Sequence, residues 1–102
     1  MDRIATLRQF VSEDPNNSLA RYGLAMEYSN AGQLHQALEE FHQLLAINPD
    51  YTAAYFMAAQ TLIKASRGPE AKLMLQKGIA SAKRKSDQHA QAEMEAMLAE
   101  IS

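Results

Sequence analysis

A 34-residue recurrence is the feature that most constrains the fold of this chain. Pro15 and Pro49 lie 34 residues apart, and the apolar pattern of residues 18–51 returns over residues 52–85. Each pattern holds two runs of apolar residues at helical spacing, so each run forms one apolar stripe on a helix. A glycine, Gly32, stands between the two runs of the first pattern, where a helix is expected to end. The spacing therefore predicts helical hairpins that follow one another along the chain.

The ends of the chain fit the same scheme. Residues 2–13 carry one apolar helical stripe that stops before Pro15, as expected for the second helix of a hairpin without its first. Residues 86–101 have apolar side chains on one side and mostly polar ones on the other. Because a helical array needs an end that is polar outward, we interpret this segment as a capping helix rather than a detachable amphipathic peptide. The predicted divisions of the single domain (1–102) are 2–13, 18–51, 52–85 and 86–101.

The pattern resembles the tetratricopeptide repeat (TPR), in a small domain of bacterial type, over about residues 2–82. In that family, small residues stand where paired helices cross, and Ala25, Ala37, Ala59 and Ala71 fill those positions. Large residues stand between them, and a proline ends each repeat. The resemblance implies an all-α fold of antiparallel helical hairpins, stacked as a right-handed solenoid of about six helices.

Several residues depart from the family pattern. Arg21 replaces a large aromatic side chain, so it must reach water or an acidic neighbour. Ser66 replaces the turn glycine of the second repeat, and Gly78 replaces a packing residue, which we expect to weaken its helix by about 1 kcal/mol relative to alanine. Ser18 is the predicted N-cap of its helix. After Ala80 the repeat frame is lost.

Composition narrows the class of protein. The chain has 102 residues and no cysteine, so it holds enough material for one modest core without disulfides or thiolate metal sites. It has neither an export signal nor an apolar run long enough for a membrane span, which predicts a cytoplasmic protein. The opening Met1 and the polar last helix favour a complete chain.

No residue pattern supports catalysis. The four glycines are scattered, so no phosphate-binding loop is present, and no serine lies in a nucleophile motif. His35, Glu39 and His42 share one helix face, yet that face points away from the partner helix and the groove, so solvated side chains are favoured over a metal site. We expect no enzyme activity, cofactor or metal.

A basic run raises the possibility of nucleic-acid binding. Residues 51–85 carry seven basic side chains and one acidic one, while both flanking segments are acidic. The acidic flanks and the lack of interleaved aromatic residues count against this function.

The family resemblance implies a concave groove lined by the first helix of each hairpin. The positions that would face it include Leu19, Ser29 and Ala53. The candidate peptide-binding residues are Tyr22, Met26, Asn30, Phe56, Gln60, Ile63 and Lys64. Because Tyr22 and Met26 stand where a chaperone-tail clamp of this family has lysine and asparagine, we reject that partner class.

The predicted function is thus a non-catalytic, scaffold-like protein-interaction module that binds a peptide or protein segment. Exposed apolar side chains at Tyr22, Met26, Phe56 and Ile63 would mark the surface. The alternative is a self-assembling structural element, such as a homodimer, whose groove is covered by its own helix or by a second copy. The sequence does not identify the partner.

Overall fold

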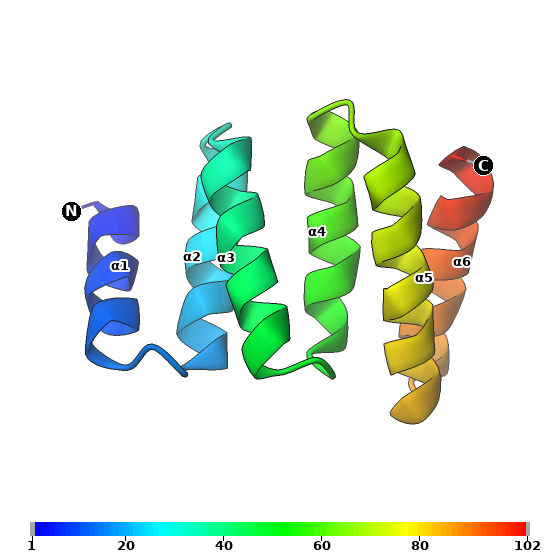
Figure 1. Ribbon diagram of the computed structural model, residues 1–102, viewed down its shortest axis with the longest axis horizontal. Coiled ribbons are helices and arrows are strands. Elements are labelled where there is room, and N and C mark those ends of the chain that lie inside the picture. The colour runs from blue at the N-terminus through cyan, green and yellow to red at the C-terminus, as the bar shows by residue number, and fades with distance from the viewer. Residues whose placement is uncertain (1, 102) are drawn as a thin grey trace.

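The computed structural model describes residues 2–101, which form six helices and no strand. Successive helices run antiparallel and stand side by side along the long axis of the molecule (Figure 1). The predicted all-α architecture is confirmed. The helices are α1 (Arg3–Glu13), α2 (Ser18–Asn30), α3 (Leu34–Ile47), α4 (Thr52–Lys64), α5 (Gly68–Arg84) and α6 (Gln88–Ile101).

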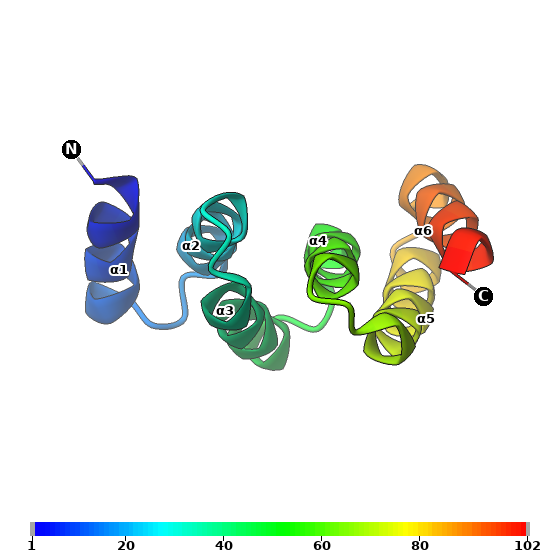
Figure 2. The ribbon, with the colours of Figure 1, turned by 90° about the horizontal axis from the view of Figure 1, so that it is seen from above.

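The helices are arranged in two rows, which Figure 2 shows from above. Helices α2, α4 and α6 make one row, while α3 and α5 make the other. Each hairpin packs tightly, α2 on α3 and α4 on α5, and α4 also touches both α2 and α6. Helix α1 packs on α2 alone among the described helices. Helix α6 therefore caps the array and also stands where the first helix of a third repeat would stand.

Small residues let the paired helices cross closely. Ala25 and Ala37 meet within the first hairpin, and Ala59 and Ala71 occupy the equivalent positions of the second; all four are completely buried. Large side chains, including Phe41, fill the space between the crossings. The complete burial of these four alanines confirms their predicted roles. A larger side chain at a crossing would push the two helices apart.

The three hairpin turns share one hydrogen-bonding pattern. At the end of α2 the Gln33 N–H donates to the Tyr28 carbonyl at 2.9 Å, and the Gly32 N–H donates to Ser29. This pair of bonds is a Schellman motif, which requires a left-handed residue after the helix. Gly32 has φ 78°, and Ser66 and Ser86 take the same place after α4 and α5 with φ 60° and 55°. Serine thus holds a conformation that favours glycine.

The start of α2 differs by one residue from the predicted cap. Asn17, not Ser18, caps α2, since its side-chain oxygen accepts the Ala20 N–H at 3.0 Å, whereas Ser18 already belongs to the helix. Asp87 does the same for α6 by accepting the Ala90 N–H at 3.0 Å. An amide or carboxylate oxygen at this position satisfies one of the free N–H groups of the first turn.

Gly78 is required by the packing, a role that the expected weakening of its helix did not include. It lies where α5 meets both α4 and α6. A Cβ atom here would overlap Met94 Sδ and would lie 2.6 Å from Tyr55 Cβ. The missing side chain therefore makes room for two neighbouring helices at once.

Arg21 finds the acidic neighbour that was predicted for it. Its Nη1 lies 2.9 Å from Glu40 Oε1 on α3, and its Nε donates to the Pro15 carbonyl at 2.8 Å. In the next repeat the hydroxyl of Tyr55 donates to the Pro49 carbonyl at 2.6 Å. Two different side chains thus make the same hydrogen bond to the loop before the helix.

Candidate functional site

A pocket of about 320 Å³ lies between the first halves of α2, α4 and α6. All three helices belong to the same row (Figure 2). Its wall is mainly apolar, while three exposed polar side chains, Asp87, His89 and Glu93, stand at its mouth. We call it the row pocket. The residues that line it are Tyr22, Thr52, Ala53, Phe56, Met57, Asp87, His89, Ala90, Glu93 and Met94.

The ring of Tyr22, which lines the row pocket, packs against two further aromatic rings. The Tyr22 ring lies 5.1 Å from the Tyr51 ring and 6.4 Å, edge-on, from the ring of Phe41. Burial raises the pKa of Tyr22 above its ordinary value, and the neighbouring Tyr51 raises it further. Burial raises the pKa of Tyr51 as well. Both hydroxyls stay neutral at physiological pH, so the Tyr22 ring in the pocket wall and the Tyr51 ring beside it carry no charge.

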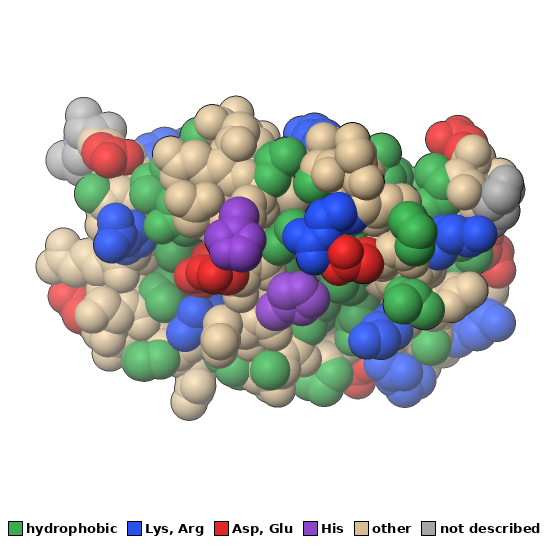
Figure 3. All heavy atoms as spheres, turned by 45° about the horizontal axis from the view of Figure 1, so that its top comes forward, with side chains coloured by type: hydrophobic (Ala, Val, Ile, Leu, Met, Phe, Trp, Pro, Cys, Tyr) green, Lys and Arg blue, Asp and Glu red, His purple; other side chains and the backbone are tan. Residues whose placement is uncertain are grey.

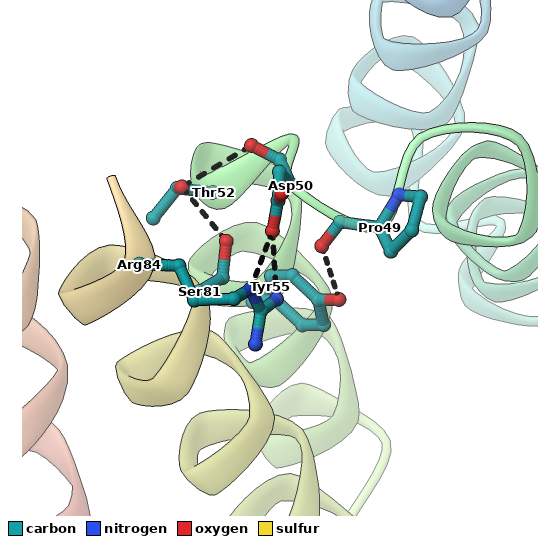
Figure 4. Close-up of polar contacts among 6 residues, drawn as sticks. All are labelled: Pro49, Asp50, Thr52, Tyr55, Ser81 and Arg84. Carbon is teal, nitrogen blue, oxygen red and sulfur yellow. Dashed lines mark hydrogen bonds and ion pairs between the residues drawn. The ribbon is translucent and has the colours of Figure 1, made fainter.

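Polar contacts fix the start of α4 against the end of α5, as Figure 4 shows. The Thr52 hydroxyl lies 3.0 Å from the Ser81 hydroxyl and donates to the Asp50 carbonyl at 3.3 Å. Arg84 bonds the Asp50 carboxylate through Nε at 2.9 Å and Nη2 at 2.7 Å. Since Thr52 also lines the row pocket, these bonds hold one wall of the pocket on a rigid base.

The structure brings together only some of the predicted groove residues. Tyr22 and Phe56 line the row pocket, half-buried. Met26 and Gln60 are also half-buried and lie one turn further along α2 and α4, followed by Ile63, which is 37% exposed. These residues continue the surface of the row away from the pocket.

Two polar residues of the prediction, Asn30 and Lys64, lie at the ends of their helices, apart from the row pocket. Asn30 and Lys64 are exposed at the last residues of α2 and α4. Asn30 lines a separate hollow with Arg3 and Glu27, on the side of α2 that faces α1.

Two further positions do not face the groove as the resemblance implied. Ser29 is buried, and its hydroxyl lies 3.1 Å from that of Thr61, so it joins α2 to α4. Leu19 is 72% exposed, but it lines a hollow against α1. Ser29 is buried because α4 lies beside α2 in the same row, and Leu19 lies against α1 because α1 packs on another side of α2.

Sequence reasoning missed the contribution of α6 to the site. It treated this helix as a cap, whereas Ala90, Glu93 and Met94 line the row pocket together with Thr52 and Met57. A signal was present at Lys85-Ser86-Asp87, which forms the same turn as the two earlier hairpins. Such a turn returns the chain to the row of first helices.

The face formed by α3 and α5 shows charged side chains of both signs and scattered apolar groups (Figure 3). On α3, His35 Nε2 lies 3.1 Å from Glu39 Oε1, and both side chains are exposed. On α5, the Arg67 guanidinium holds the pKa of the Glu70 carboxyl below its usual value through their hydrogen bonds. Over residues 2–101, no three His, Asp or Glu side chains are grouped to hold a metal ion, and no helix could span a membrane.

Comparison with known proteins places the chain in a family. A tetratricopeptide repeat family model matches residues 28–101, and a second one matches residues 6–39. The chain belongs to the tetratricopeptide repeat family, a non-catalytic fold for protein interactions. The first match includes α6, which the predicted frame had excluded. No curated protein matches the chain by sequence.

Solved structures share the fold. A tetratricopeptide repeat domain protein from Salinibacter ruber is 25% identical, with a TM-score of 0.81, over 87% of this chain and 90% of that one. The type III secretion translocator chaperone SycD of Yersinia enterocolitica is 18% identical, with a TM-score of 0.89, over 96% and 68%. PcrH, solved in complex with the chaperone binding region of PopD, is 17% identical, with a TM-score of 0.90, over 96% and 74%.

Proposed function

We propose that this chain binds a peptide or protein segment along the row of α2, α4 and α6, with one apolar side chain of the partner in the row pocket. The observation that carries the proposal is the pocket itself, because its apolar wall lies open beside half-buried Tyr22 and Phe56. Concave sites with apolar walls and a few polar groups are typical binding sites. The complex of PcrH with a segment of PopD supports the same kind of partner.

The neighbouring residues extend this site in one direction. Met26, Gln60 and Ile63 continue the surface beyond the pocket, and Lys64 stands at its far end. Asn30 lies on the side of α2 that faces α1. A partner would gain about 25 cal/mol for each Å² of apolar surface that it buries, before the cost of association. The pocket would anchor one side chain, and the surface beyond it would select its neighbours.

A bulky residue at Ala53 tests the proposal without touching the core. Ala53 is exposed and lines the pocket, so Ala53→Trp fills the pocket from its mouth. Peptides are first selected from a random peptide library on the immobilised protein, and their affinities are then measured by fluorescence anisotropy. We expect Ala53→Trp to weaken binding at least about tenfold. Ala80→Trp, an exposed position on α5, is the matched control and should leave the affinity unchanged.

The affinities of the selected peptides for Ala53→Trp can also contradict the proposal. If no selected peptide loses affinity in Ala53→Trp, the row pocket is not the binding site. Amide chemical shifts of the labelled protein locate the contact independently, and we expect changes at Tyr22, Met26, Phe56 and Gln60 when peptide is added. Shifts at the same residues on concentration alone would favour the alternative, a groove covered by a second copy.

A cytoplasmic location and a scaffold role stay predictions.

A further inference from the structure

The N-terminal edge of the array exposes positions that the next repeat buries. Phe10 is 52% exposed, whereas Leu44, the residue 34 positions later on α3, is completely buried. Leu7 is half-buried, and its equivalent, Phe41, is completely buried. The cause is visible in Figure 1, where α1 stands at the end of the array with only α2 beside it.

The exposed side chains surround a hollow of about 450 Å³ between α1 and α2. Leu19 projects beside it and is 72% exposed, more than any other large apolar side chain of the described residues. Gly23 forms part of the wall, which leaves room for an incoming side chain. The hollow has no charged side chain in its lining, which consists of Leu7, Phe10, Asn17, Leu19, Ala20 and Gly23. Projecting apolar groups and an apolar hollow thus lie on one edge.

The other half of this edge is charged, which limits what can cover it. Arg3 Nε lies 3.3 Å from Glu27 Oε1, and these two residues stand where the next repeat has the buried Ala37 and Thr61. A helix packed along the whole edge would remove this ion pair from water, which is costly. The favoured occupant therefore covers the apolar half, leaves Glu27 uncovered and offers Arg3 a carboxylate at the rim of the contact.

The exposed face of α1 is complementary to itself. Arg3, Thr6, Phe10 and Glu13 are spaced by three and four residues, so they share one side of the helix. When two such helices lie antiparallel about a two-fold axis centred near residue 8, Arg3 of one copy faces Glu13 of the other. Phe10 of one copy then meets Thr6 of the other copy and the hollow beside that Thr6. A two-fold interface requires this kind of self-complementarity.

We propose that two copies of this chain associate through their N-terminal edges, α1 antiparallel to α1, with Phe10 and Leu19 of each copy packed against the hollow of the other. The contact area is small, so the association is weak and depends on concentration. The row pocket stays free in both copies, since it lies on the other side of α2. The dimer would present two binding sites, and a partner with two segments would bind it more tightly than one copy.

Sedimentation velocity of the full chain from about 10 µM to 1 mM tests the proposal. We expect the sedimentation coefficient to rise with concentration. The double variant Phe10→Gln, Leu19→Glu should raise the dissociation constant at least about tenfold. Leu73→Gln is the matched control, since Leu73 is 59% exposed on α5, away from this edge. A monomer at every concentration would overturn the proposal, and so would self-association that Ala53→Trp abolishes while the double variant leaves it intact.

Charge reversal tests the antiparallel geometry separately. Arg3→Glu and Glu13→Lys each place like charges opposite one another in a dimer of identical copies, so each variant alone should associate more weakly. An equimolar mixture of the two should associate more strongly than either alone, because Glu at position 3 then faces Lys at position 13. A mixture no stronger than the separate variants would overturn the antiparallel pairing. Circular dichroism checks that every variant stays folded.

Discussion

At the scale of single residues, side-chain size at the helix crossings decides the packing. Gly78 shows this most clearly, because α4 and α6 both approach its Cα, while Gly23 sits in α2 with free space around it. A Cβ on Gly23 would lie 3.5 Å from Leu7, an ordinary contact distance. The two helical glycines should therefore respond oppositely to the same substitution.

We predict that Gly78→Ala destabilises the protein by about 1–3 kcal/mol, since the methyl group overpacks the junction with Met94 and Tyr55. Gly23→Ala should stabilise it by about 0.5–1 kcal/mol, because alanine favours the helix and the site has room. Urea unfolding followed by circular dichroism measures both changes. Equal effects of the two substitutions would show that helix propensity, rather than packing, governs Gly78.

At the scale of helices and turns, the same Schellman geometry ends α2, α4 and α5. Only the first of these turns has glycine at the left-handed position, while Ser66 and Ser86 hold φ values of 60° and 55°. A side chain in this region costs energy, because Cβ approaches the following carbonyl oxygen. The second and third turns are therefore less stable than their hydrogen bonds alone would suggest.

We predict that Ser66→Gly and Ser86→Gly each stabilise the protein by about 0.5–1 kcal/mol. Ser12→Gly is the control, because Ser12 lies in the last turn of α1 without a left-handed φ, so glycine there should bring no gain in stability. Thermal unfolding of the three variants gives the comparison. A loss of stability in Ser66→Gly would mean that the serine side chain makes a contribution that outweighs the backbone strain.

Helix α6 has a second role besides that of a cap, because it packs into the row of first helices. Its polar outer side fits the predicted cap, yet Met94 is almost completely buried against Gly78 and Tyr55, and α6 also touches α4. The repeat frame suggested that the array ended before this helix, because α5 is longer than α3 and moves α6 out of register. The extra residues of α5 shift the 34-residue spacing in the sequence, but they do not prevent α6 from packing against α4 and α5.

At the scale of the whole molecule, the helices are held by unequal numbers of neighbours. Helix α4 packs against α2, α3, α5 and α6, while α1 packs only on α2. The helices of a repeat array are stabilised mainly by the helices next to them. The stability of this molecule should therefore decrease from its centre toward the N-terminal edge.

We predict that backbone amides of α1 exchange with solvent at least about tenfold faster than those of α4, because α1 opens without disturbing the other helices. Native-state hydrogen exchange, measured at low protein concentration so that a second copy does not cover α1, tests this order. Uniform protection across all six helices would contradict it and would indicate a single cooperative unit.

The 34-residue recurrence by itself determined the all-α hairpin architecture, because helical periodicity is a local property of a sequence. The family resemblance of the sequence added the alanines at the crossings, which the structure buries. The same resemblance implied a groove lined by Tyr22 and Phe56, and both line the row pocket, half-buried. The recurrence did not reveal that Gly78 is needed, that Ser29 is buried, or that α6 completes the row pocket. Those features depend on which helices become neighbours, and only the packing of all six helices decides that.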